Sequence, residues 1–143
     1  MSGEEPDRLS VGDVVAAGTF LLRRDTLVRY AGASGDFNPI HYRDDVAESV
    51  GLPGVLAHGM LTMGLAVQPV VDRFGAARIV DYQVRFTRPV PVPPDGEVLL
   101  EVEAKVGQLD PEAGVARIDL SATVAGRAVL GRAQVRVRHG GTA

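Results

Sequence analysis

Apolar and polar residues alternate along most of the second half of the chain. Alternation with a period of two places successive side chains on opposite faces of an extended chain, so it predicts half-buried β-strands. Residues 110–114 and 125–127 are rich in turn-forming residues and predict hairpin turns. Four apolar rows follow this pattern: Val80, Tyr82, Val84 and Phe86; Val98, Leu100, Val102, Ala104 and Val106; Ala116, Ile118, Leu120, Ala122 and Val124; and Val129, Gly131, Ala133, Val135 and Val137.

The longest apolar stretch, residues 59–74, is apolar on nearly every side of a helix and carries no charge before Asp72. A helix of this composition is predicted to be buried. Pro69 has no amide hydrogen to donate, so it predicts a kink or an early end of that helix. One buried helix followed by long antiparallel strands indicates an α+β domain in which the helix lies against one face of the sheet.

The first third of the chain predicts shorter elements. Residues 16–22 form an apolar run typical of a strand, and residues 26–33 predict a helix with Asp25 as its N-cap. A second short helix is expected over residues 44–50, because glycines and a proline follow it. The proline-rich stretch 89–94 predicts a rigid bend between strands.

A length of 143 residues, with 45% apolar and 23% charged residues, is typical of one globular domain. We expect the domain to cover residues 9–139, with a disordered N-terminus at 1–8 and a polar tail at 140–143. No apolar run is long enough to cross a bilayer, and residues 1–8 lack the apolar segment of a signal peptide. A cytoplasmic location is therefore expected. The absence of cysteine excludes disulfides and thiolate chemistry.

The charge of the chain bears on its partners. A net charge of -3 and a pI near 5.6 argue against binding to nucleic acid, which needs a basic surface. All basic residues except Lys105 are arginines. Arginine suits planar recognition of phosphates, although a compositional bias of the source genome explains the same observation.

Candidate chemistry is concentrated in the segment Ser34-Gly35-Asp36-Phe37-Asn38-Pro39-Ile40-His41. Glycine, asparagine and proline in this order predict a loop. Asp36 and His41 are at most roughly 17 Å apart in an extended chain, and a turn between them can bring both within reach of one water molecule. A carboxylate and an imidazole can divide two proton transfers at neutral pH. Both are also ordinary residues of surface turns, so spacing alone leaves the two interpretations open.

Three segments resemble a known family. The run Tyr30-Ala31-Gly32-Ala33-Ser34-Gly35-Asp36-Phe37-Asn38-Pro39-Ile40-His41 resembles the hydratase motif of the MaoC-like, (R)-specific enoyl-thioester hydratases and dehydratases. Ala57-His58-Gly59-Met60-Leu61 is similar to the oxyanion segment of that family, and Phe86-Thr87-Arg88-Pro89-Val90 to its next strand and bend. Within the family the likeness is closest to the catalytic B subunit of mycobacterial (3R)-hydroxyacyl-ACP dehydratases. The resemblance implies a hot-dog fold and reversible hydration of trans-2-enoyl thioesters to (3R)-hydroxyacyl thioesters.

The loop chemistry and the resemblance together suggest a role for each candidate residue. His58 lies beside Gly59 and could contact the thioester, but we favour a structural histidine that fixes the loop before the long helix. His139 is expected to be inert. The three histidines lack metal-ligand spacing, so we expect neither a metal nor a cofactor. The remaining roles are Asp36 and His41 as the catalytic pair, Gly59 as a main-chain oxyanion donor, Asn38 and Ser34 as loop support, Tyr30, Thr62 and Met63 as candidates for the acyl channel, and Arg85 and Arg88 as candidates for contact with coenzyme A or a carrier protein.

The resemblance also implies a dimer, because hot-dog domains join their sheets edge to edge. Two arrangements stay open: a homodimer, or a heterodimer in which a sibling subunit completes the acyl tunnel and is needed for activity. Rival functions are a thioesterase on the same fold, a non-catalytic partner subunit, and a hydratase of an unusual acid. The sequence shows no pattern that indicates the length or branching of the acyl chain. It also does not indicate the choice between coenzyme A and acyl carrier protein, or the physiological direction.

Overall fold

A computed structural model describes residues 8–140, and its largest element is one antiparallel sheet. Most of the predicted N-terminal segment 1–8 and tail 140–143 lies outside these residues. The sheet has six strands in the order β1-β3-β4-β6-β2, and β5 pairs with β4 at one end. The strands are β1 (Val14–Leu22), β2 (Ile79–Phe86), β3 (Val98–Asp110), β4 (Val115–Val124), β5 (Arg127–Ala128) and β6 (Leu130–Arg138).

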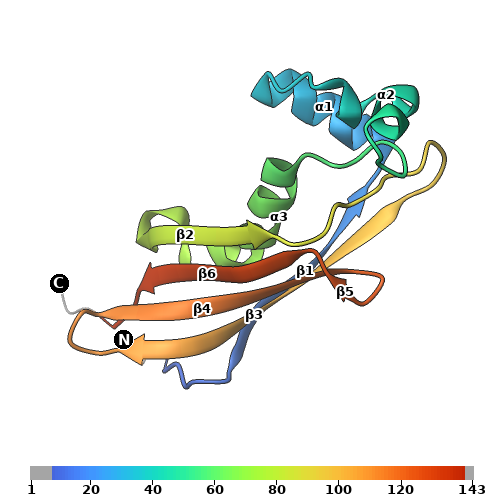
Figure 1. Cartoon of the computed structure of the whole chain (residues 1–143). Coiled ribbons are helices and arrows are strands. Elements are labelled where there is room, and N and C mark those ends of the chain that lie inside the picture. The colour runs from blue at the N-terminus through green and yellow to red at the C-terminus, as the bar shows by residue number, and fades with distance from the viewer. Residues whose placement is uncertain (1–7, 141–143) are drawn as a thin grey trace.

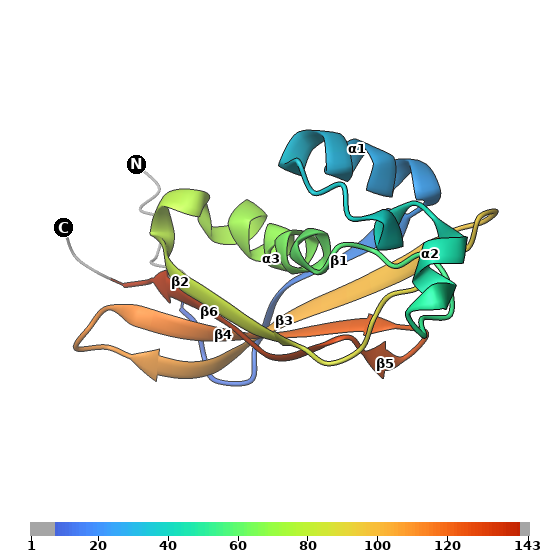
Figure 2. The same cartoon turned by 45° about the horizontal axis from the view of Figure 1, so that its top comes forward.

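All helices lie on one side of the sheet (Figures 1 and 2). The long helix α3 contacts strands β1, β2, β3, β4 and β6, so it packs across the sheet as predicted. No helix within residues 8–140 is long and apolar enough to cross a membrane. The helices are α1 (Arg24–Ser34), α2 (Asp44–Ser49) and α3 (Gly59–Phe74), with two single-turn 3₁₀ helices, η1 (Pro39–His41) and η2 (Ala76–Arg78).

The alternating apolar rows of β3 and β4 form the core, which confirms the prediction that the residues of each row face the same side of the sheet. In β3, the residues from Leu100 to Val106 at every second position are buried, while Glu101, Glu103 and Lys105 between them are exposed. The apolar row of β4 is buried in the same way from Ala116 to Ala122. Burial of apolar surface contributes about 25 cal/mol per Å², so these rows supply much of the driving force for folding.

Helix α3 has the predicted bounds, but the prediction of uniform burial is wrong. Its buried residues form one stripe, from Thr62 through Ala66 and Val70 to Phe74. Met60, in contrast, is 60% exposed. One sheet covers only one side of a helix, so the opposite side, with Met60, Gly64, Gln68 and Asp72, is exposed. Pro69 does not end the helix early, and it is buried in the stripe that faces the sheet.

The start of α1 also differs from the prediction. The helix begins at Arg24, with Arg23 rather than Asp25 as its N-cap. The hydroxyl of Thr26 accepts a hydrogen bond from the Arg23 main-chain N–H at 3.1 Å, which satisfies a donor that an unassisted helix start leaves open. Asp25 lies one residue inside the first turn, where its negative charge interacts favourably with the helix dipole.

The connection from β2 to β3 forms hydrogen bonds in addition to the predicted bend. It runs extended beside residues 55–57, since Ala57 donates to the Val90 carbonyl and Val92 donates to the Val55 carbonyl, both at 2.9 Å. Arg24 binds this region from the side, donating to the Val92 carbonyl at 2.6 Å and to Asp44 at 2.8 Å. The hydrogen bond from Arg24, together with one from the Val55 N–H, lowers the pKa of Asp44.

We predict that Tyr82→Phe lowers the free energy of unfolding by about 1 kcal/mol, the typical net value of one hydrogen bond. The Tyr82 hydroxyl donates to the Met63 carbonyl of α3 at 2.7 Å, and burial raises the pKa of Tyr82 so that the hydroxyl keeps its proton. Urea unfolding followed by circular dichroism measures the change. The matched control is Tyr42→Phe, because Tyr42 is 48% exposed and its loss should change stability by less than about 0.5 kcal/mol. Equal effects of both changes would contradict the prediction.

Candidate active site

The imidazole of His41 is fixed in orientation by the main chain. His41 ends the single turn η1, which begins with the Asn38 side chain accepting from the Ile40 N–H at 3.2 Å. Nδ1 of His41 lies 2.7 Å from the Leu56 carbonyl oxygen, and a carbonyl oxygen only accepts hydrogen bonds. Nδ1 must therefore carry a hydrogen, and in the neutral ring Nε2 carries the lone pair. Nε2 is thus the nitrogen that can accept a proton.

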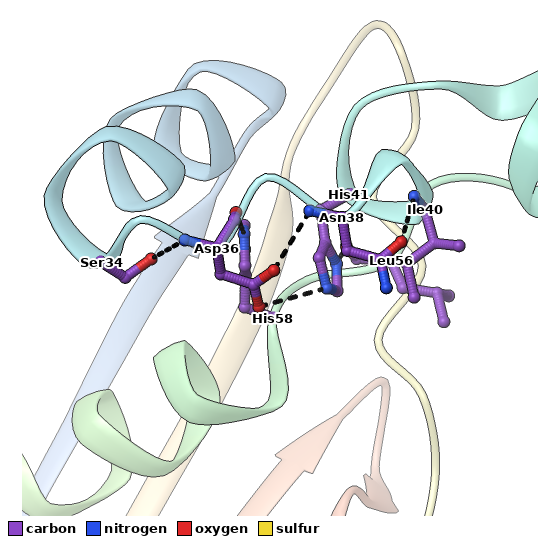
Figure 3. Close-up of polar contacts among 7 residues, drawn as sticks. All are labelled: Ser34, Asp36, Asn38, Ile40, His41, Leu56 and His58. Atoms are coloured by element: carbon purple, nitrogen blue, oxygen red, sulfur yellow. Dashed lines mark hydrogen bonds and ion pairs between the residues drawn. The ribbon is translucent and has the colours of Figure 1, made fainter.

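Asp36 lies on a loop whose turns are made by its neighbours. Gly35 ends α1 with φ 77°, a left-handed conformation that favours glycine. The Ser34 hydroxyl accepts from the Asp36 N–H at 3.1 Å, and Asp36 Oδ1 accepts from the Asn38 N–H at 3.1 Å. These contacts leave Oδ2 directed toward His41 (Figure 3).

The two candidate catalytic groups are close but do not touch. Asp36 Oδ2 and His41 Nε2 are 3.9 Å apart, and their side chains are 49% and 10% exposed. This separation is longer than a direct hydrogen bond. It is short enough for one water molecule to contact both groups, as the sequence analysis expected for a turn between them.

His58 lies nearer the centre of the site than the sequence analysis assumed. It is the N-cap residue of α3 and only 1% exposed. Its Nε2 lies 3.2 Å from the Asp36 main-chain carbonyl, and its ring stacks on His41 with centroids 3.9 Å apart. Tyr30 contacts the same ring edge to face at 4.7 Å. Burial lowers the pKa of His58, so the ring is neutral at pH 7.

A cavity of about 290 Å³ opens beside this pair. Its polar side includes His41, Gly59 and Thr62. Gly59 begins α3, so its N–H has no partner within the helix. Phe86 lies over Gly59: a Cβ at position 59 would lie only 3.1 Å from the Phe86 ring, so glycine permits this close packing. The apolar side of the cavity is lined by Leu56, Ala57, Pro89, Val90, Val129 and Leu130.

The structure brings some of the predicted binding residues to this cavity and others elsewhere. Thr62 and Arg88 line it, and Arg88 donates to the Ala128 carbonyl at 3.1 Å. Arg85 is an exposed residue of β2 outside the lining. Tyr30 packs against His58, and Met63 contributes its carbonyl to the bond with Tyr82, so neither is placed as an acyl-channel residue by these contacts.

Sequence reasoning missed the Phe86 contact and the partners of His58. The sequence placed Phe86 in an alternating row and in the segment that resembles the family's next strand and bend, and neither indicates the helix start that it covers. The string Ala57-His58-Gly59 did carry a signal for His58, because a histidine directly before a helix start lies beside whatever that helix end binds.

Asp36, His41 and His58 each offer a ligand atom, and these atoms lie within 4.8 Å of one another. A metal ion lies close to the plane of each imidazole that binds it. The rings of His41 and His58 are inclined by only 21° and are stacked, so their planes do not meet near the site. This arrangement disfavours a shared metal ion, and the expectation of no metal stays a prediction.

Comparison with known proteins identifies the family. Residues 7–124, more than half of the chain, match the model of the MaoC-like domain. The chain therefore belongs to the MaoC-like domain family. A solved MaoC-like dehydratase superposes with a TM-score of 0.88 at 35% identity, covering 92% of this chain and 41% of that one. The hot-dog fold implied by the resemblance is thereby confirmed.

Two relatives are similar in sequence. Over 65 residues the chain is 45% identical to the 3-hydroxyacyl-thioester dehydratase X of Mycobacterium tuberculosis, covering 46% of this chain and 22% of that protein. Over 114 residues it is 32% identical to the 3-hydroxybutyryl-CoA dehydratase of Methylorubrum extorquens, covering 78% of this chain and 70% of that protein. The chain thus spans less than a quarter of the length of the first relative.

We predict that protonation of His58 contributes to acid destabilisation between pH 7 and 5.5. Its pKa is lowered by burial from the ordinary value of 6.5, so below that pH the unfolded chain binds a proton that the folded chain does not. The free energy of unfolding should therefore decrease as the pH falls below about 6.5, the ordinary pKa of histidine. The measurement is the difference in unfolding free energy between the wild type and His58→Gln at several pH values.

The difference in free energy of unfolding between the wild type and His58→Gln should narrow as the pH falls, because only the wild type carries the buried histidine. Asp44 and Asp45, whose pKa values are lowered, titrate below this window and do not interfere. A difference that stays constant from pH 7 to 5.5 would show that His58 is not the group responsible.

Proposed function

We propose that this chain catalyses the reversible addition of water to trans-2-enoyl thioesters, giving (3R)-hydroxyacyl thioesters. The observation that carries the proposal is the 3.9 Å gap between Asp36 Oδ2 and His41 Nε2 beside the start of α3. Membership of the MaoC-like family supports it, and so do the two relatives, which are named as a thioester dehydratase and a CoA dehydratase. The (3R) configuration follows from the resemblance of the Tyr30 to His41 segment.

In this mechanism the water molecule lies between Asp36 and His41. Its oxygen bonds to C3 of the substrate while Nε2 of His41 takes one of its protons, and the C2–C3 double-bond electrons move toward the thioester carbonyl. The resulting enolate accepts a proton at C2 from the acid–base pair, which returns both groups to their starting state. One water molecule is added, and dehydration runs through the same steps in reverse.

The enolate oxygen needs a hydrogen-bond donor that is already in place. The Gly59 N–H belongs to the first turn of α3 and lines the cavity with His41. The positive end of the helix dipole favours negative charge at this point, and removal of one oxyanion donor in other enzymes costs roughly 3 kcal/mol. Ser34 and Asn38 support this chemistry indirectly, because they hold the loop that carries Asp36.

The partner that we propose is a second hot-dog subunit. Strand β2 is an edge strand on which Val80 and Phe86 are exposed, and Met60 is exposed at the start of α3. Exposed strand edges next to apolar surface favour pairing with another chain. Either a second copy or a sibling subunit satisfies this requirement, and light scattering of the protein expressed alone distinguishes a homodimer from a monomer.

We predict that His41→Ala lowers kcat for hydration of crotonyl-CoA by about 100-fold or more, because a positioned acid–base group typically contributes that much. The assay follows the loss of the conjugated enoyl thioester, with a thiol trap present. The matched control is His139→Ala, which removes a histidine near the C-terminal end of the described chain and should leave kcat unchanged. Retention of more than about a tenth of the activity in His41→Ala would contradict the assignment.

The thiol trap separates hydration from thioester hydrolysis. Consumption of the enoyl group without release of thiol supports a hydratase, whereas release of thiol identifies a thioesterase. If the isolated wild type is silent, the assay is repeated with acyl-carrier-protein substrates and with a co-expressed sibling hot-dog subunit. Silence in all of these assays would refute the proposal.

We predict that Arg88→Glu raises KM for a coenzyme A thioester about tenfold with a smaller effect on kcat. Arg88 lines the cavity, so reversing its charge removes an attraction for substrate phosphates worth about 1.4 kcal/mol. The control is Arg29→Glu, because Arg29 lies on α1 with its side chain 82% exposed and pairs with Asp25. An unchanged KM for both coenzyme A and carrier-protein substrates in Arg88→Glu would remove Arg88 from the binding site.

A further inference from the structure

The gap between Asp36 and His41 requires an explanation. A half-exposed carboxylate and an imidazole this close would be expected to form a direct hydrogen bond, which is shorter by about 1 Å. Contacts with Ser34 and Asn38 shape the loop around Asp36, but they do not fix its distance from His41. The bond to Leu56 fixes His41 only from the opposite side of its ring.

His58 contacts both members of the pair. Its Nε2 lies 3.2 Å from the main-chain carbonyl of Asp36, which makes that nitrogen the donor. Its ring stacks on the ring of His41 at 3.9 Å and at an angle of 21°. His58 is itself held from two directions, by the start of α3 and by the edge-to-face contact with Tyr30.

We propose that His58 is a positioning residue that holds Asp36 and His41 apart by the width of one water molecule. The N–H bond keeps the Asp36 main chain from moving toward His41, and the stacked ring keeps the His41 imidazole from tilting toward Asp36. If either restraint is lost, the two groups can close into a direct ion pair. Such a pair leaves no space for the reacting water, and it favours the protonated imidazolium, which cannot take a proton from water.

Only a neutral ring suits this position. Asp36 from the loop and Tyr30 from α1 lie against the His41–His58 stack, and Arg88 lines the same cavity as His41. His41 becomes an imidazolium when it takes a proton from water, and a second imidazolium stacked on it would be repelled. Burial of His58, which is 1% exposed, favours its neutral form and agrees with this requirement.

The test uses His58→Leu, which removes both the donor and the ring, and His58→Gln, which keeps an N–H donor for the Asp36 carbonyl. The chain contains three histidines, so NMR can follow the pH titration of the His41 ring directly in each protein. Closure into an ion pair favours the imidazolium, so the titration midpoint of His41 should rise by on the order of one pH unit in His58→Leu. The rise should be less than half as large in His58→Gln. His139→Gln is the histidine-matched control and should leave the midpoint unchanged.

The kinetic readout rests on the proposed function. In the hydration assay His58→Leu should lower kcat at least about tenfold with little change in KM, and His58→Gln should recover part of that loss. Thermal unfolding and circular dichroism verify that each variant is folded at the temperature of measurement.

The two readouts keep the two proposals separable. A histidine with a purely structural role would lower thermal stability but leave the His41 midpoint of the folded variants unchanged, and that result would overturn the inference. If the wild type hydrates no enoyl thioester but the His41 midpoint still rises in His58→Leu, the positioning role is supported while the hydratase is refuted. Equal midpoint shifts in His58→Leu and His58→Gln would overturn the part assigned to the N–H donor.

Discussion

The site depends on the joining of two chain segments, residues 36–41 and 55–58, by hydrogen bonds that involve the main chain. Leu56 donates its N–H to the Ile40 carbonyl at 3.1 Å and accepts from His41 Nδ1 at 2.7 Å. His58 contacts the other end of the first segment at the Asp36 carbonyl. Because each of these contacts uses a main-chain atom, the pairing depends on backbone path more than on side-chain size. A shift in either segment would move the acid, the base and the start of α3 together.

The sheet supplies the fixed frame for this pairing. Residues 55–57 are held against the β2–β3 connection by the hydrogen bonds with Val90 and Val92, and Arg24 ties that connection to Asp44. Helix α3 then begins at Gly59 and crosses the sheet with its buried stripe toward the core. The core therefore positions the start of α3, where we propose the oxyanion donor, while the less buried loop carries Asp36. A donor held in place by the core suits a reaction whose charge develops on the carbonyl oxygen.

The sequence was most informative where one physical signal acted alone. The bounds of α3 were predicted at both ends from the apolar run between Gly59 and Gly75, although Pro69 also allowed an earlier end. The start of α1 was predicted wrongly because Thr26 caps it from inside the helix. The exposed side of α3 was not predicted because composition does not reveal which side a sheet covers. The motif predicted that Asp36 and His41 lie close together. The role that we propose for His58 in their 3.9 Å gap rests on contacts that cross more than 15 residues of chain. Contacts of that range follow from tertiary structure and have no local signature.

A gradient of exposure separates the chemical roles of three polar groups that lie together. His58 is 1% exposed, the His41 side chain 10% and the Asp36 side chain 49%. Desolvation disfavours the charged form of any group, so it suits a histidine that must stay neutral and would hinder a carboxylate that must stay ionised. The most buried position therefore suits the positioning histidine, and the most exposed suits the acid. His41 lies between them, enclosed enough to exclude bulk water from its Nδ1 bond and open enough on Nε2 to reach a substrate.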